Sequence, residues 1–299
     1  MKNLNDLTVI ILTYNTPEKI LLDCLKTVDK NVKTLIVENS SFFEHNDLVT
    51  KNFSNIEVIC TGENLGYGKG NNFGIKHATT DYVLILNPDV ICDHNFFSNI
   101  VEVTNEVEDF SIIGCQYLND KVFMPAGFFN RAKNKEFSKK FKNKEIEKLS
   151  RVEWVTGCSI LINLKEFKDK KIFDENFFLY FEEFDLCKSL SIIDKKVFTS
   201  NKLKVHHLGF QSSINENHTE NLKKINIKNW HYMWSSFYFY KKNYNFLYAI
   251  FKLSGKFVKS FFKMIFYTIT FQKENKDKYL FRFLGLLNSI LGKPSKFRD

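Results

Sequence analysis

The sequence has few arginines, no paired-cysteine motif and no long uncharged hydrophobic run, and each absence excludes a class of protein. Only four of its 43 basic residues are arginine, and no compact segment combines arginine with aromatic residues, so no nucleic-acid partner is expected. The six cysteines form no Cys-x-x-Cys pair, which argues against a zinc site and predicts free thiols in a reducing cytosol. No uncharged apolar run reaches the roughly 20 residues of a membrane-spanning helix. The first residues lead directly into a predicted strand, so no signal peptide is expected.

The composition is otherwise that of a globular protein with a positive surface. Of the 299 residues, 44% are hydrophobic and 26% are charged, which suits one large core or two modest ones. The formal net charge of +9 comes mostly from lysine and favours anionic partners such as nucleotide sugars or anionic lipids.

Short hydrophobic runs alternate with helix-like segments in the first 90 residues. The predicted strands are Leu7–Thr13, Lys33–Glu38, Ile56–Cys60 and Tyr82–Leu86; helices are expected from Pro17 to about Val28, after Ser41, and over 66–77. Strands that are apolar along their whole length and separated by helices predict a parallel sheet covered on both faces.

The remaining chain divides into two parts. Residues 131–151 are rich in lysine and are expected to form a mobile, solvated loop, with strand-like sequence resuming at Trp154. From about Leu222 the sequence becomes helical, and we find no internal repeat. We therefore expect a first domain over residues 1–221 and a helical region over 222–299.

The residues that end the fourth predicted strand are candidates for a ligand-binding site. Asn87-Pro88 stops the strand, because proline cannot continue a ladder, and Asp89 follows directly. Open α/β folds bind ligands at the carboxyl ends of such strands, where Mg²⁺ or Mn²⁺ often joins a carboxylate to substrate phosphates. The hypothesis is a metal–diphosphate site; the alternative is a surface turn after a core strand.

Polar segments also follow the other three predicted strands. They are Thr13-Tyr14-Asn15, Glu38-Asn39-Ser40 and the glycine-rich residues 63–72. Because carboxyl ends of parallel strands share one edge, we expect these segments to converge near Asp89. A carboxylate at Glu38 is suited to a ribose or base, and the glycines allow close approach of the backbone to a ligand. Their place after the third strand argues against a dinucleotide fingerprint.

Two further clusters lie downstream. Glu182, Glu183 and Asp185 fall at the start of a predicted helix, whose dipole favours charged carboxylates suited to general-base catalysis; helix capping is the alternative. His206 and His207, after a short predicted strand, are either metal ligands or structural residues. The strand-like segment with Trp154, Thr156 and Gly157 is a candidate acceptor-side wall or a core strand.

The order and spacing of these motifs resemble the family-2 inverting glycosyltransferases of the GT-A fold, especially the bacterial rhamnosyltransferase-like branch. The resemblance spans roughly residues 7–213. It is carried by Thr13-Tyr14-Asn15, Val37-Glu38-Asn39-Ser40-Ser41, Glu63 to Gly74, Asn87-Pro88-Asp89, Trp154-Val155-Thr156-Gly157, Phe173-Asp174-Glu175 through Asp185-Leu186, and His207 near Ser212.

The resemblance implies roles for individual residues. The implied nucleotide-sugar site consists of Thr13, Tyr14, Asn15, Glu38, Asn64, Gly66, Lys69, Asn72 and Asn87. The implied ligands of a Mg²⁺ or Mn²⁺ ion are Asp89 and His207, with His206 as the alternative to His207. The implied acceptor side consists of Trp154, Thr156 and Gly157. Glu183 stands where the family usually has its catalytic Asp. Its extra methylene changes the position of the base, so Glu182 and Asp185 remain alternatives.

The implied activity is transfer of a sugar, with inversion, from a UDP- or dTDP-sugar such as dTDP-rhamnose to a glycan or lipid-linked acceptor. The implied pathway is synthesis of cell-surface polysaccharide or lipopolysaccharide. Alternatives are a galactosyl- or galactofuranosyltransferase on the same scaffold, or a catalytically weak, membrane-associated binding subunit.

Lysines recur within the aromatic-rich residues 230–271. At about 100° per residue, Lys241, Lys252, Lys256, Lys259 and Lys263 fall on one stripe of a helix whose other faces are apolar. Such a stripe predicts a helix lying on an anionic membrane, and hence a cytoplasmic protein peripheral to the inner face of the membrane. The alternative is a helix packed on the catalytic domain or on a homodimer partner.

Overall fold

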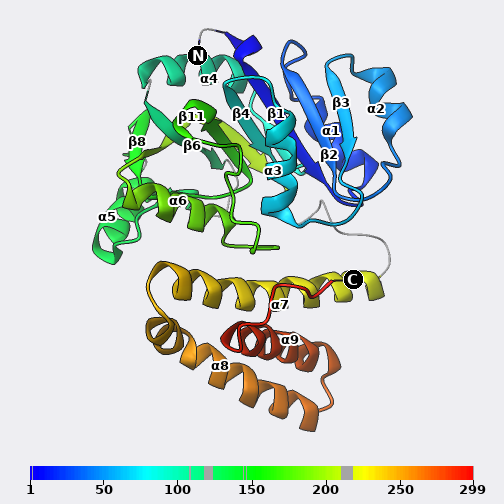
Figure 1. Ribbon diagram of the computed structural model, residues 1–299, viewed down its shortest axis with the longest axis vertical. Coiled ribbons are helices and arrows are strands. Elements are labelled where there is room, and N and C mark those ends of the chain that lie inside the picture. Colours follow the sequence, from blue (N-terminus) through cyan, green and yellow to red (C-terminus); the bar gives the residue numbers. More distant parts are fainter. Residues whose placement is uncertain are drawn as a thin grey trace.

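A computed structural model describes residues 1, 3–107, 109–117, 124–143, 145, 147–209 and 218–298. Figure 1 shows an α/β body built around one twisted sheet, with three long helices stacked beneath it. Ser212, part of the predicted His207 motif, lies outside the described residues.

The large sheet is parallel in its first half and mixed in its second. Its strands are β1 (Leu7–Thr13), β2 (Lys33–Glu38), β3 (Ile56–Cys60), β4 (Tyr82–Leu86), β5 (Val90–Cys92), β6 (Phe110–Tyr117), β8 (Leu149–Val152), β10 (Ser159–Asn163) and β11 (Lys196–His207). The order is β3-β2-β1-β4-β10-β6-β11-β5, with β8 also on β11. The four strands predicted from the sequence have the predicted bounds and pair in parallel. β10 then enters antiparallel between β4 and β6.

Helices cover both faces of this sheet. They are α1 (Glu18–Leu25), α2 (Asn46–Asn52), α3 (Tyr67–His77), α4 (Phe96–Glu106), α5 (Arg131–Lys142) and α6 (Glu182–Ile192), joined by the short helices Leu4–Asp6 and Leu164–Glu166. Alternate side chains of β1 serve opposite cores. Val9 and Ile11 pack with residues of α1 and α4, whereas Ile10 packs with those of α3 and α6. The predicted α/β fold with a C-terminal helical extension is confirmed.

The expected loop at 131–151 is wrong. Residues 131–142 form α5, whose N-cap Asn130 accepts hydrogen bonds from the backbone of Ala132 and Lys133. Phe137 is buried against the sheet, so a single aromatic anchor holds an otherwise charged helix. β8 follows and pairs with β11, and the two-stranded ladder of β7 (Ala126–Gly127) and β9 (Trp154–Val155) lies beside it.

The C-terminal region consists of α7 (His218–Asn243), α8 (Phe246–Ile269) and α9 (Lys273–Ile290). The three helices share a small core of Met233, Phe237, Ala249, Leu253 and Leu286. No helix within the described ranges is long and apolar enough to cross a membrane.

The predicted continuous lysine stripe is wrong at its first member. The side chain of Asn245 caps a new helix by accepting a hydrogen bond from the Tyr248 backbone at 2.8 Å. Lys241 therefore belongs to α7, and only the four lysines from Lys252 onward share α8. The proposed domain boundary at residue 221 stays a prediction.

Candidate active site

The turn after β4 brings Asp89 to the end of β11. The Val90 backbone donates to the Asn87 carbonyl at 3.2 Å, which closes the turn, and β5 then pairs with β11 so that His207 faces Val90. Asp89 is only 1% exposed, and its Oδ1 lies 3.3 Å from His207 Nε2. The Leu208 backbone also donates to the Asp89 carbonyl at 2.9 Å. The two predicted metal ligands therefore meet, although they are 118 residues apart.

The two histidines have different surroundings. They end the 12-residue strand β11 rather than following a short strand, which corrects the sequence-based interpretation. Successive side chains of a strand point to opposite faces. His207 accordingly faces Asp89, whereas His206 is exposed. This geometry favours His207 over His206 as a metal ligand.

The Asp89–His207 pair fits a divalent cation that is bound together with a substrate. Within the described ranges, no group of three His, Cys, Asp or Glu side chains is arranged to hold a metal on its own. One carboxylate and one imidazole leave most coordination positions to other oxygens. Mg²⁺ is commonly held in this way, by one or two carboxylates together with substrate phosphates and water. Asp89 and His207 would hold the ion, and a diphosphate would complete its coordination.

The acidic cluster begins α6, as predicted, directly after an unusual turn. Tyr180 and Phe181 have φ values of 70° and 73°, a conformation that is an outlier for bulky residues. The Tyr67 backbone donates to the Phe178 carbonyl at 2.8 Å, and Ser235 Oγ donates to the Leu179 carbonyl at 2.8 Å. Contacts from α3 and α7 thus hold a strained turn at the entrance to the acidic helix.

Glu182 is buried and Glu183 is half-buried beside it, and the pKa values of both carboxyls are raised. Burial raises the pKa of Glu183 to about 7. Burial and the neighbouring charge of Glu183 raise the pKa of Glu182 well above its usual range. We assign the proton of the pair to Glu182, because its pKa is raised more strongly than that of Glu183. Glu183 is therefore the group poised to accept a proton near neutral pH.

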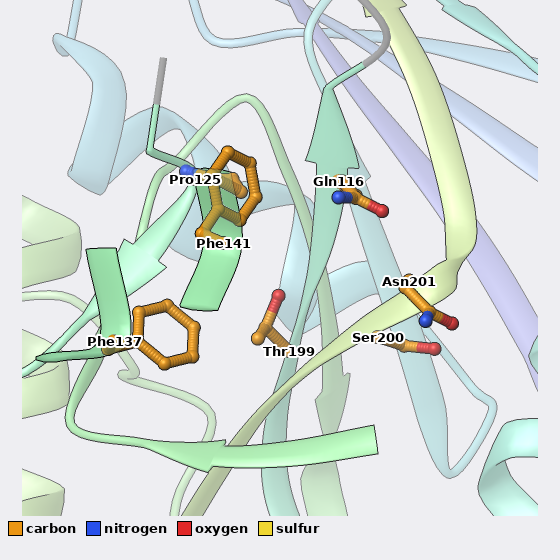
Figure 2. A pocket seen from close by; sticks show the side chains of 7 residues that line it. All are labelled: Gln116, Pro125, Phe137, Phe141, Thr199, Ser200 and Asn201. Carbon is orange, nitrogen blue, oxygen red and sulfur yellow. The ribbon is translucent and has the colours of Figure 1, made fainter. Parts of the chain in front are cut away.

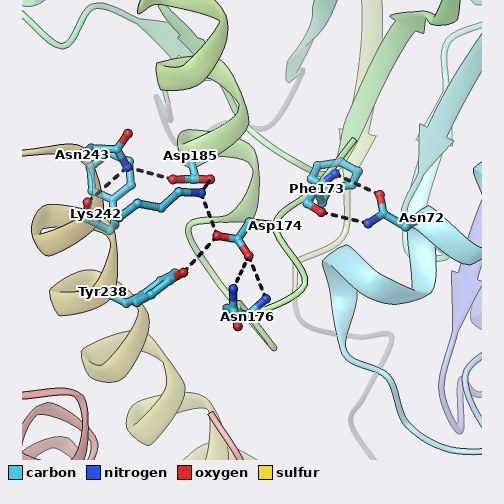
Figure 3. A network of polar contacts seen from close by, with 9 residues as sticks. Asn72, Phe173, Asp174, Asn176, Asp185, Tyr238, Lys242 and Asn243 are labelled. Carbon is cyan, nitrogen blue, oxygen red and sulfur yellow. Dashed lines mark hydrogen bonds and ion pairs between the residues drawn. The ribbon is translucent and has the colours of Figure 1, made fainter. Parts of the chain in front are cut away.

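The Asp185 side chain points toward Lys242 and Asn243 of α7 (Figure 3). Its carboxylate accepts from Lys242 Nζ at 2.6 Å and from Asn243 Nδ2 at 2.8 Å. Lys242 also contacts Asp174 at 2.7 Å, and Tyr238 donates to Asp174 at 3.1 Å. Asp185 thus ties α6 to α7, and this geometry favours Glu183 as the base.

Segment 156–158 connects the metal side to the acidic side. Tyr67 OH donates to the Gly157 carbonyl, and a Cβ built on Gly157 would lie 3.5 Å from the Glu183 carboxyl carbon. On the other side, Cys158 Sγ lies 2.8 Å from Tyr117 OH, and the Tyr117 ring lies 5.9 Å from the His207 ring.

The electrostatics of Cys158 agree with this arrangement. Burial raises the pKa of its thiol most, and the charges of both Asp89 and Glu183 raise it further. The Cys158 carbonyl also accepts from the Asn87 backbone at 2.8 Å. Asp89 and Glu183 therefore flank one short segment and belong to one site.

The ends of β1 and β2 form the predicted donor side. Thr13 Oγ1 donates to Glu38 Oε2 at 2.7 Å, and both residues are buried. Tyr14 and Asn15 follow in the turn, where Asn15 takes φ +48°, a left-handed conformation that asparagine tolerates. These residues converge as predicted from parallel pairing.

Asn39 holds the donor loop, the segment of residues 61–66 between β3 and α3, which is a role that the sequence analysis did not assign. Its Nδ2 donates to Asn64 Oδ1 at 3.1 Å and to the Gly66 carbonyl at 3.2 Å, and its Oδ1 accepts from the Leu65 backbone at 2.9 Å. Gly66 has φ +81°, and a Cβ there would lie 2.3 Å from the Phe178 carbonyl oxygen. The signal available in the sequence was the position of Asn39 directly after Glu38, within the motif Glu38-Asn39-Ser40.

The side chain of Asn72 is hydrogen-bonded to the protein backbone. Its Oδ1 accepts from the backbones of Ile172 and Phe173, and its Nδ2 donates to the Phe173 carbonyl at 2.9 Å (Figure 3). The amide thus joins α3 to the segment before the acidic cluster. Lys69 is half-buried one turn earlier on α3. Donor contacts of both residues stay predictions.

The predicted acceptor-side residues Trp154, Thr156 and Gly157 lie in or next to segment 156–158, and Gly157 of this segment lies beside Glu183. The Trp154 ring lies 5.2 Å from that of Phe184, and Thr156 Oγ1 hydrogen-bonds Tyr117 OH and the Pro125 carbonyl. A separate small pocket lies between β6, β11 and α5, lined by Gln116, Pro125, Phe137, Phe141, Thr199, Ser200 and Asn201 (Figure 2). Its volume of about 10 Å³ is about what one water needs, and it is lined by none of the predicted site residues.

Two cations of the C-terminal region reach the donor side. Burial and the neighbouring charge of Lys224 lower the pKa of Lys228 on α7, and the charge of Asp89 opposes this lowering. The Arg298 guanidinium lies 3.5 Å from the Phe178 ring centroid. Burial lowers the pKa of Arg298, and the charge of Glu63 in the donor loop opposes this lowering. No sequence motif marked either residue, because each reaches the site only through tertiary packing.

The sheet order and the helices on both of its faces are those of the GT-A fold. The family model described as "Glycosyl transferase family 2" matches residues 8–198, and the chain belongs to this family.

Two curated relatives each match 62% of the chain. It is 25% identical over 201 residues to the low-salt glycan biosynthesis hexosyltransferase Agl10 of Haloferax volcanii, a match covering 62% of this chain and 61% of that protein. It is 24% identical over 210 residues to the rhamnosyltransferase WbbL of Escherichia coli K12, covering 62% and 76%. The match to Agl10 thus spans less than two thirds of that protein.

Solved structures agree in fold. GalNAc-T7 with UDP, GalNAc and Mn²⁺ superposes with a TM-score of 0.53 at 12% identity, covering 87% of this chain and 58% of that one. Mannosyltransferase PcManGT of Pyrobaculum calidifontis, with GDP-Man and Mn²⁺, gives 0.53 at 10% identity, covering 96% and 88%.

Proposed function

We propose that this protein transfers a hexose, with inversion, from a UDP- or dTDP-sugar to a glycan or lipid-linked acceptor. The observation that carries the proposal is the placement of the Asp89–His207 pair and Glu183 on either side of segment 156–158. A single displacement needs this separation, because the base and the leaving group act on opposite faces of the anomeric carbon.

In the proposed reaction, Glu183 accepts the proton of the acceptor hydroxyl as its oxygen attacks the anomeric carbon. The bond from that carbon to the diphosphate breaks, and the nucleoside diphosphate leaves with the electron pair. Asp89 and His207 would hold the Mg²⁺ or Mn²⁺ ion, which supplies charge neutralisation for the departing diphosphate. Lys228 adds positive charge on the same side. Neutral Glu182 places no second negative charge beside the Glu183 carboxylate.

Similarity to a hexosyltransferase and a rhamnosyltransferase supports a sugar donor of this class and a role in cell-surface glycan synthesis. The structures with UDP or GDP-Man and Mn²⁺ support a nucleotide donor and a divalent cation.

The direct test is a thermal-unfolding panel of UDP, dTDP and GDP, each with and without Mn²⁺, because a ligand that binds only the folded state raises the unfolding temperature. We expect stabilisation by UDP or dTDP that requires Mn²⁺, loss of this effect in Asp89→Asn, and its retention in Asp47→Asn, an exposed control on α2. Equal stabilisation of Asp89→Asn would contradict the assigned site.

Turnover then needs a donor-sugar panel, with the anomeric configuration of the product read by NMR. Retained configuration would overturn the proposed single displacement. Metal-dependent binding without transfer to any acceptor would instead favour a weakly catalytic binding subunit.

A further inference from the structure

We propose that α8 lies on the surface of an anionic phospholipid bilayer, with its exposed apolar face in the acyl–headgroup boundary. This inference extends the proposed function by placing the enzyme where a lipid-linked acceptor would be presented. It rests on two independent features of the described residues, the apolar face of α8 and the charge of the C-terminal region.

The first feature is an exposed apolar face on α8. Large side chains along it are strongly exposed: Leu247 by 77%, Phe251 by 81%, Phe262 by 63% and Ile269 by 69%. At about 100° per residue these positions share one side of the helix, roughly opposite Ala249 and Leu253, which pack into the C-terminal core. A contiguous aromatic and aliphatic face of this kind marks an interaction surface.

The second feature is the charge of this region. Residues 221–273 contain ten lysines and no aspartate or glutamate, whereas the other 246 residues carry 33 basic and 34 acidic side chains. The net positive charge of the chain is therefore confined to the C-terminal helices. Anionic lipids attract such a segment, and this complementarity selects a bilayer over a second copy, whose equal charge would repel it.

The lysines of α8 lie at the edge of its apolar face. Lys252, Lys256 and Lys263 extend along the helix side toward α7 and α9, where their Nζ atoms lie 5.9, 5.3 and 5.0 Å from the ring centroids of Tyr240, Tyr232 and Tyr279. Lysines in this position reach the headgroups while the apolar face enters the boundary.

The arrangement of the helices fits this orientation. α7 lies against the α/β body, and α8 lies on the far side of α7 from the sheet (Figure 1). A bilayer beneath α8 therefore leaves the carboxyl edge of the sheet in water, where a soluble nucleotide sugar reaches it.

The test is flotation of the full chain with vesicles of phosphatidylglycerol and phosphatidylcholine. We expect binding to vesicles rich in phosphatidylglycerol, little binding to pure phosphatidylcholine, and weakening by salt. Replacing the four lysines of α8, at 252, 256, 259 and 263, with glutamine should weaken binding at least roughly tenfold, because each contributes about fivefold near an anionic surface. The matched control replaces four exposed lysines of α5, at 133, 135, 139 and 142, and should bind as the unmodified chain does.

A second variant tests the apolar face. Phe251→Ser with Phe262→Ser should lose vesicle binding while keeping its unfolding temperature, because both side chains are exposed. Equal binding to both lipids, unchanged binding of the α8 variants, or a dimer that these variants convert to a monomer would each overturn the proposal. The assay needs no sugar transfer, so its failure is distinguishable from failure of the proposed catalytic function.

Discussion

Replacing Glu183 with glutamine should abolish transfer and at the same time stabilise the fold. The pKa of Glu183 is about 7 in the folded protein, against 4.5 for a glutamate side chain in water. A carboxyl with a raised folded-state pKa destabilises the protein once pH exceeds the unfolded-state pKa, and the effect is complete above the folded-state pKa. Glutamine keeps the shape and removes the buried charge, so the stabilisation should grow with pH.

The linkage relation gives the size of this effect. Removing the ionisation should stabilise the protein by about 1 kcal/mol at pH 5.5 and about 3 kcal/mol at pH 8.5. The larger value corresponds to a rise of roughly 5 °C or more in unfolding temperature for a chain of this size. Urea unfolding at the two pH values measures the difference directly. In the unmodified enzyme, the rate of transfer should fall about tenfold for each pH unit below 7, because the base becomes protonated.

Glu182→Gln is the matched control. Glutamine is uncharged, as the protonated Glu182 carboxyl is, and has nearly the same shape, so this variant should retain most of the turnover. The reasoning is refuted if Glu183→Gln transfers sugar at the normal rate, or if its gain in stability at pH 8.5 is no larger than at pH 5.5.

Three further changes test the supports of the site. Lys242→Met should lower the free energy of unfolding by about 2–3 kcal/mol, because it leaves the buried Asp185 carboxylate without its cation; urea unfolding measures this, and an unchanged midpoint would refute the tether. Asn72→Ala should cost about 2–3 kcal/mol in the same assay, because several buried backbone groups lose their partner; a loss confined to donor affinity would instead support the predicted donor contact. Gly66→Ala should weaken nucleotide binding in calorimetry and lower stability by at least about 1 kcal/mol, because the methyl group meets the Phe178 carbonyl and φ is +81°; normal binding would show that the loop adapts.

The first half of the fold could be predicted because its signals are local. β1 to β4 are continuous apolar runs with polar residues directly after them, so both their bounds and the convergence of Thr13, Glu38 and Asp89 followed from the sequence. The second half depends on distant partners. Within the part of the chain that the structure describes, β8 pairs with β11 alone, and Phe137 is the one buried residue of α5. Neither element therefore carries the hydrophobic periodicity from which secondary structure is predicted.

The candidate site divides in the same way. Motif order placed Asp89, His207 and Glu183 together, but it could not distinguish three acidic residues within one helical turn. Only packing does so, because Asp185 meets Lys242 from α7 whereas Glu183 meets segment 156–158. Asn245 is a residue type that often caps a helix, so a break between two helices could have been predicted there. The aromatic pattern continues on both sides of Asn245, however, and favours one long helix.

The strained turn at Tyr180 and Phe181 bears on how this enzyme can be re-engineered. Its left-handed residues are held by Ser235 and by ring contacts from Tyr232 and Phe239, all on α7. A chimaera that exchanges the C-terminal helices with those of another family member would remove these supports and release the turn from its conformation. For the hybrid to keep its catalytic geometry, α6, the turn before it and α7 would therefore have to come from the same parent protein.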